Sequence, residues 1–177
     1  MNLQKKKERW QCLVTAFAMV IDEDVETFME RLGHDGSEVI FGHLAEPHCR
    51  RGHHIQEIIY WLFARGRTVT PIQMIPFIAD PSGEMRPVPV RYQLADSDAE
   101  PTSDGDEVDL FEENHRRFGN MLNRHRGVIE GITPNGKRHA VAFDRGRIFD
   151  PDGKEYPFNA ENCAANGFYP DIAWVVE

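Results

Sequence analysis

The sequence has few basic residues for its size. Its 177 residues include 20 Lys and Arg against 29 Asp and Glu, which gives a formal net charge of −9. Phosphate backbones and anionic lipid headgroups repel a protein of this charge, so we expect neither a nucleic-acid nor a membrane partner. The one basic run, residues 5–9, is too short to reverse the balance, and we interpret it as a solvated N-terminal arm.

Cysteine is also scarce. Cys12, Cys49 and Cys163 are an odd number at wide spacing, which does not fit a disulfide framework. No apolar stretch reaches the ~18 residues of a membrane span. The N-terminal residues lack the small-residue cleavage site of a secretory signal peptide. We therefore predict a cytoplasmic protein with reduced thiols.

The hydrophobic patterning that is present predicts an α+β fold. Apolar residues recur at helical spacing near residues 11–21, 24–33 and 55–66. The last third instead carries short β-rich runs separated by turn signals. It predicts antiparallel strands near residues 127–132, 139–143, 147–150 and 172–176. We expect the N-terminal helices to pack on one face of this C-terminal sheet.

The length fits one domain covering residues 1–177. Residues 80–109 differ from the rest, because they hold nine acidic and two basic residues and many Pro, Ser and Gly. We interpret this stretch as an acidic loop or insertion within the domain.

Cys12 stands at the first turn of the predicted helix 11–21, before a run of small apolar residues. The first turn of a helix has unpaired backbone N–H groups and the positive end of the helix dipole. Such a position favours the thiolate, the nucleophilic form of cysteine. The alternative is a buried structural cysteine on an apolar helix.

His139 and Asp150 lie on two strands that are predicted to form a hairpin. If Arg145-Gly146 is a two-residue loop, Val141 lies opposite Asp150, and His139 is diagonal to Asp150 on the same face. Diagonal neighbours are ~7–8 Å apart at the backbone, within reach of long side chains. A loop one residue longer would turn the two side chains to opposite faces.

These three residues have the chemistry of a nucleophilic triad. An imidazole beside Cys12 would form a thiolate–imidazolium pair, and the carboxylate of Asp150 would orient the ring of His139. Backbone N–H groups at the helix start would hold an oxyanion, helped by the side-chain amide of Gln4 or Gln11.

The order Gln4, Cys12, His139 and Asp150-Pro151 resembles the papain-like cysteine peptidases, above all the group of bacteriocin-leader (double-glycine) peptidases and small stand-alone bacterial and phage proteins. The resemblance covers roughly residues 4–66 and 127–153. It implies a papain-like fold with Cys12 as nucleophile, His139 as base, Asp150 as orienting acid and Gln4 in the oxyanion hole. It implies a peptide or protein substrate and neither cofactor nor metal.

The predicted function is a thiol-dependent hydrolase that cleaves a peptide or isopeptide amide through an acyl-enzyme. Deamidation and acyl transfer use the same machinery and remain alternatives. A third alternative is a non-catalytic protein on the same fold that binds a host partner through the acidic insertion.

A second cluster, His48, Cys49, His53 and His54, contains residue types that bind zinc. Its spacing fits no common zinc finger and a second cysteine pair is missing. We therefore predict no metal site here, and we interpret the cluster as a polar loop that caps the helix beginning near residue 55.

Overall fold

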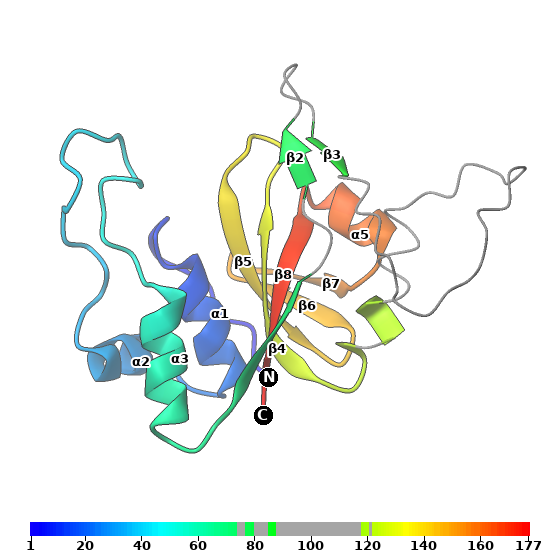
Figure 1. The fold of residues 1–177 in the computed structure, drawn as a ribbon, viewed down its shortest axis with the longest axis horizontal. Coiled ribbons are helices and arrows are strands. Elements are labelled where there is room, and N and C mark those ends of the chain that lie inside the picture. The colour runs from blue at the N-terminus through cyan, green and yellow to red at the C-terminus, as the bar shows by residue number, and fades with distance from the viewer. Residues whose placement is uncertain (74–76, 80–84, 88–117, 121) are drawn as a thin grey trace, which may run out of the picture.

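The computed structural model describes residues 1–73, 77–79, 85–87, 118–120 and 122–177. Nearly all of the predicted acidic insertion at 80–109 lies outside the described residues. The architecture is α+β, with N-terminal helices packed on a C-terminal six-stranded antiparallel sheet (Figure 1). The helices and the sheet therefore follow the order predicted from the sequence.

The described helices are α1 (Cys12–Val20), α2 (Val25–Leu32), α3 (Ile55–Phe63) and α5 (Ala160–Ala165). The main sheet has the order β1-β8-β4-β5-β6-β7. Its strands are β1 (Val69–Gln73), β4 (Arg126–Ile132), β5 (Arg138–Asp144), β6 (Arg147–Asp150), β7 (Lys154–Pro157) and β8 (Tyr169–Val176). A separate pair consists of β2 (Phe77–Ala79) and β3 (Met85–Pro87).

The local sequence explains the bounds of α2. The Asp24 side chain accepts hydrogen bonds from the backbone N–H groups of Glu26 and Thr27 at 3.0 and 3.1 Å, which caps the start of the helix. Gly33 ends the helix in the left-handed conformation, with φ of +85°, which costs glycine little. No helix among the described residues has the length and apolarity needed to cross a membrane.

The sheet is the middle layer of the molecule, because side chains on both of its faces are buried. Val128, Ala140 and Ala142 pack with α1, α2 and α3 in one core cluster. Ile129 and Val141, from the same strands, belong to a second cluster on the other side. The second cluster includes Cys163 of α5. The prediction of helices on a single face is therefore incomplete, since α5 covers the second face (Figure 1).

The central helix α1 anchors the first cluster. All seven residues from Val14 to Val20 are buried, with no exposed surface. Burying a large apolar side chain stabilises a fold by roughly 1.5–3 kcal/mol, so the position of α1 against the sheet is strongly determined. Its first residue, Cys12, is consequently held in a fixed place relative to β5.

Candidate active site

Cys12 is the first residue of α1 and is half-buried. The turn before it is held by Gln11, whose Oε1 accepts hydrogen bonds from the backbone N–H groups of Lys7 and Glu8 at 3.2 and 3.1 Å. No side chain caps α1. The backbone N–H groups of its first turn are thus not taken up by a side chain beside the thiol.

The β5–β6 hairpin has the predicted two-residue loop. Asp144 pairs with Arg147, which leaves Arg145 and Gly146 as the turn. Both have positive φ, +48° and +79°, as a type I′ turn requires. Because this register is the predicted one, His139 and Asp150 meet rather than point to opposite faces.

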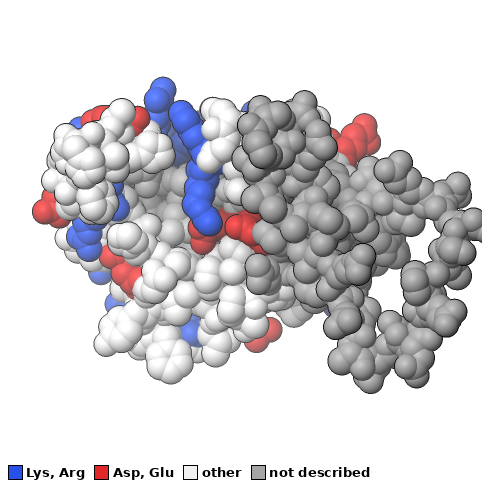
Figure 2. Space-filling model, turned by 45° about the horizontal axis from the view of Figure 1, so that its top comes forward, with Lys and Arg blue, Asp and Glu red and all other residues white. Residues whose placement is uncertain are grey.

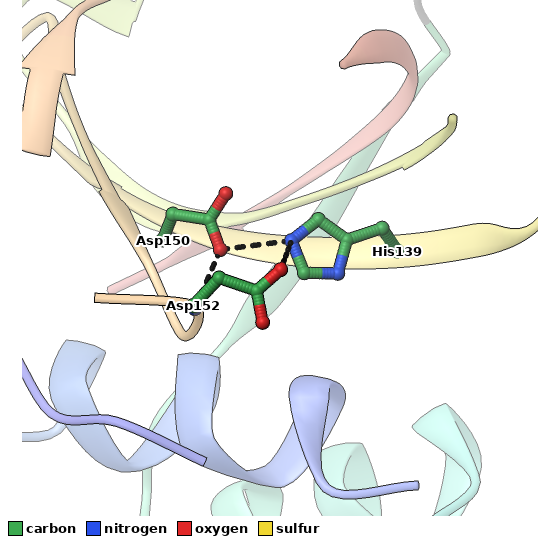
Figure 3. Close-up of side chains that lie close together, drawn as sticks. All are labelled: His139, Asp150 and Asp152. Atoms are coloured by element: carbon green, nitrogen blue, oxygen red, sulfur yellow. Dashed lines mark hydrogen bonds and ion pairs between the residues drawn. The ribbon is translucent and has the colours of Figure 1, made fainter. Parts of the chain in front are cut away.

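His139 and Asp150 form a buried hydrogen-bonded pair. Nε2 of His139 lies 2.9 Å from Oδ1 of Asp150, and the two residues are 9% and 5% exposed. The same Oδ1 accepts the backbone N–H of Asp152 at 2.8 Å, which fixes the carboxylate after the strand ends. In Figure 3 the second ring nitrogen of His139 points away from both carboxylates, towards the side of the ring where α1 lies.

Cys12 completes the constellation, because its thiol is among the groups that act on the imidazole of His139 and raise its pKa. Burial alone would lower the pKa of His139, but the hydrogen bonds and charges of Asp150 and Cys12 outweigh it and raise this pKa to about 9. Since Nε2 is bonded to Asp150, Nδ1 is the nitrogen left for the thiol. The imidazole is held charged at neutral pH between a carboxylate and a sulfur atom.

The pKa of Asp150 is shifted in the opposite direction to that of His139. Its burial would raise the pKa of its carboxyl group, but the hydrogen bond and charge of His139 and the N–H of Asp152 overcome this, and the pKa lies below its usual value. Asp150 is therefore an anion at neutral pH, as an orienting acid must be.

Two residues at this site were not singled out from the sequence, Lys6 and Asp152. Nζ of Lys6 lies 2.6 Å from Oδ1 of Asp152, and Oδ2 of Asp152 lies 4.0 Å from Nε2 of His139. The backbone N–H of Lys6 also bonds the carbonyl of Pro151 at 2.9 Å. Lys6 thus fastens the N-terminal segment to the β6–β7 turn, while the other residues of the basic run 5–9 are exposed, as predicted.

Charged side chains of both signs gather on one face of the molecule. On the face in Figure 2, Lys and Arg side chains run in a band that reaches a group of Asp and Glu side chains near the centre. On this face, the basic side chains of the acidic protein therefore lie next to carboxylates.

The structure does not bring Gln4 to Cys12. The Gln4 amide donates to the carbonyl of Glu23 at 2.6 Å and accepts the N–H of Val25 at 3.0 Å. Both partners follow the last residue of α1, which at 1.5 Å per residue is roughly 12 Å from Cys12. The Gln4 side chain instead joins α1 to α2, so its geometry is that of a structural residue.

The other candidate amide, Gln11, is also engaged elsewhere. Its Nε2 points at the sulfur of Met29 at 3.5 Å, inside the helical layer, and its Oε1 holds the turn before α1. Neither glutamine amide is directed at the thiol. The groups placed for an oxyanion are consequently the backbone N–H groups at the start of α1.

Among the described residues, one group has a donor set suited to a cation: His139, Asp150 and Asp152, whose ligand atoms lie within 4.8 Å of one another. These atoms already have partners, because Asp150 binds His139 and Asp152 binds the ammonium of Lys6. Lys6 supplies the positive charge that a metal ion would bring. We therefore interpret the two carboxylates as partners of His139 and Lys6 and not as metal ligands.

The cluster at residues 48–54 does not converge on a common point in the described structure. His53 is buried and stacks on His34, with ring centroids 4.6 Å apart. Glu57 accepts the backbone N–H of His54 at 2.7 Å and thereby caps α3. The prediction that this loop caps the third helix is confirmed.

Comparisons with protein-family models, curated proteins and solved structures found no match. The functional assignment therefore depends on the geometry of Cys12, His139 and Asp150.

Proposed function

We propose that this protein is a thiol-dependent hydrolase that cleaves an amide bond, with Cys12 as nucleophile, His139 as acid and base, and Asp150 as orienting residue. One observation carries the proposal: a buried histidine is hydrogen-bonded to a buried carboxylate, and a cysteine at a helix start acts on the same imidazole and raises its pKa. Each of these features is common alone, but their convergence on one point favours catalysis.

The geometry suggests the following steps. The thiolate of Cys12 attacks the carbonyl carbon of the substrate, and the carbonyl electrons move to its oxygen. The tetrahedral intermediate collapses, the carbon–nitrogen bond breaks, and the proton of the His139 imidazolium passes to the leaving amine. A thioester between Cys12 and the acyl group remains.

The second half of the cycle uses His139 in the opposite sense. The imidazole, now neutral, takes a proton from water as the water oxygen attacks the thioester. The second tetrahedral intermediate collapses, the carbon–sulfur bond breaks and the carboxylic acid leaves, which returns the Cys12 thiolate and the His139 imidazolium. Asp150 holds the ring in one orientation throughout and stabilises its cationic form.

Oxyanion stabilisation falls to the backbone in this proposal. The N–H groups of the first turn of α1 carry the positive end of the helix dipole, and no side chain caps them. We propose that the N–H of Cys12 is one of the donors. The papain-like fold belongs to the same proposal, supported by a nucleophile on a helix and a base on a facing strand.

Selective alkylation tests the proposal. At pH 6.5, Cys12 is expected to react with iodoacetamide at least about tenfold faster than a free thiol. His139→Ala should reduce this rate to that of a free thiol, while His43→Ala, which alters an exposed histidine, should leave it unchanged. A Cys12 that reacts no faster than free cysteine, with or without His139, contradicts the proposal.

A second measurement separates hydrolysis from the related reactions. A cell lysate is incubated with the protein or with Cys12→Ser, and new N-termini, deamidated glutamines and new crosslinks are identified by mass spectrometry. New N-termini that depend on Cys12 support amide hydrolysis. Deamidation or crosslinking alone would favour the alternatives, and no change of any kind would favour the non-catalytic binding protein.

A further inference from the structure

Lys6, from the N-terminal segment, forms an ion pair with Asp152 beside the candidate active site. The ammonium of Lys6 is 2.6 Å from Asp152, and the Lys6 side chain is only 18% exposed although lysine is normally solvated. Its backbone N–H is bonded to the carbonyl of Pro151. Lys6 is thus attached at two points to the turn that follows Asp150.

Asp152 is placed to act on His139. Its Oδ2 is 4.0 Å from the same nitrogen that bonds Asp150, and its backbone N–H is bonded to the Asp150 carboxylate. Figure 3 shows both carboxylates on the same side of the imidazole. Two anions next to one imidazolium would hold its proton more firmly than one.

Among the described residues, four charged or titratable groups lie around His139 and its carboxylate partners. Cys12 faces it from α1 and Asp150 from the end of β6. Asp152 approaches from the β6–β7 turn, and Lys6 stands behind Asp152 on the N-terminal segment. Lys6 is the one cation of the set, and it is bonded to the carboxylate that does not hold the ring directly.

We propose that Lys6 is a positioning residue that, through its ion pair with Asp152, sets the pH at which His139 releases its proton. The inference rests on the proposed function, because the ability of His139 to switch between acid and base is what Lys6 would adjust. In this arrangement Lys6 offsets the charge of Asp152, which leaves Asp150 as the dominant carboxylate partner of the ring.

The sign of the effect follows from the charges. Lys6→Met would remove the cation that offsets the charge of Asp152, so the imidazolium would persist to higher pH. Asp152→Asn would remove an anion, so the imidazolium would lose its proton at lower pH. Because Asp152 is about half exposed, solvent screens both effects, and each shift should be about 0.5–1 pH unit.

The test follows the imidazole of His139 by NMR in the full-length protein, with His139→Gln used to assign its signals. The midpoint of its titration should rise in Lys6→Met, fall in Asp152→Asn and stay unchanged in Lys6→Arg, the matched control that keeps the charge. In the double variant Lys6→Met/Asp152→Asn, removal of Lys6 should add little to the effect of Asp152→Asn.

Several results would overturn the proposal. One is an unchanged midpoint in Asp152→Asn, which does not depend on whether Lys6→Met folds. Another is an equal effect of Lys6→Met with and without Asp152, since Lys6 would then act directly and not through the carboxylate. The NMR readout needs no substrate, so it is separate from a failure of the proposed function, which would appear as slow alkylation of Cys12.

Discussion

His139 is held in its charged form by partners that exist only in the folded protein. Its pKa is raised from 6.5 to about 9, despite burial, by Asp150 and Cys12. A group with a raised pKa stabilises the fold fully below its unfolded pKa and loses that contribution as pH rises through its folded pKa. The shift corresponds to a contribution on the order of 3 kcal/mol.

The free energy of unfolding should therefore fall between pH 6.5 and 9. Asp150→Asn removes the main anionic partner of His139 and should flatten most of this decrease, whereas the exposed-site control His43→Gln should retain it. Urea denaturation at several pH values measures both slopes. Equal slopes in the wild type and Asp150→Asn would contradict the role of this pair.

For Gln4, the contacts differ from the oxyanion role that the resemblance to papain-like peptidases implies. Its amide is bonded to Glu23 and Val25 at the far end of α1 from Cys12. Gln4→Ala should reduce the free energy of unfolding by about 1–3 kcal/mol, since it leaves partly buried backbone groups unpaired. Alkylation of Cys12 at pH 6.5 should proceed at the wild-type rate. An unchanged free energy of unfolding in Gln4→Ala would contradict the structural role of this side chain.

Sequence reasoning could predict the site residues whose positions are determined by neighbouring residues in the chain. Cys12 is recognisable because a helix start is encoded in the adjacent sequence, and His139 and Asp150 because a single hairpin register relates them. Lys6 and Asp152 were missed because their pairing joins segments about 145 residues apart, and only the packing of the N-terminal segment creates it. The position of Gln4 depends on the same packing.

At the scale of elements, the β5–β6 hairpin determines whether the site exists. Gly146 has φ of +79°, where a residue with a side chain is strained. Gly146→Ala should destabilise the protein by roughly 1–2 kcal/mol.

Arg145→Asn should stabilise the protein by several tenths of a kcal/mol, because Asn tolerates positive φ in this turn better than Arg.

Inserting one residue into the β5–β6 loop tests the effect of the strand register separately from the effect of stability. One glycine added after Gly146 should move Asp150 to the other face of β6 or open the β6–β7 turn, and either change breaks its bond to His139. Cys12 should then alkylate at the rate of a free thiol, even in molecules that remain folded by circular dichroism. Rapid alkylation in the folded insertion variant would show that the register is not required.

The connection between α2 and α3 contains a second histidine with a shifted pKa, of the opposite sign. Burial, followed by the charge of His34, lowers the pKa of His53 from 6.5 to about 4. Between these values the unfolded chain binds a proton that the folded protein does not, so stability is lost as pH falls from 6.5 towards 4. This loss amounts to a value on the order of 3 kcal/mol.

His53→Phe should remove that acid sensitivity while keeping a ring to stack on His34. The wild type should lose stability from pH 6.5 to 4.5, a range above the usual pKa of carboxyl groups, and the variant should lose much less. Thermal denaturation at pH 4.5, 5.5 and 6.5 measures the difference, and the exposed-site variant His43→Gln should behave as the wild type. A variant as acid-sensitive as the wild type would exclude His53 as the cause.

For the molecule as a whole, the layered arrangement was predictable in outline and incomplete in detail. The periodicity of the first 66 residues and the alternation of the last 50 residues give the helices, most strands and their order. The strand β7 and the helix α5 were not predicted, although Asn159 caps α5 by accepting the N–H of Asn162 at 2.8 Å. The six-residue α5 is too short to show helical periodicity, and it is stabilised by packing against the sheet.

The two shifted histidines lie in different layers, and together they predict how the stability of the whole molecule depends on pH. His53 lowers stability below pH 6.5 and His139 lowers it above pH 6.5, so the free energy of unfolding should be highest near this value. The two sites share no described contact, so their effects should add. The double variant His53→Phe/Asp150→Asn should therefore have a nearly flat profile from pH 4.5 to 9, although its stability at pH 6.5 is lower. Urea denaturation across this range gives the profile, and a wild-type maximum displaced by more than about one pH unit would show that other groups dominate.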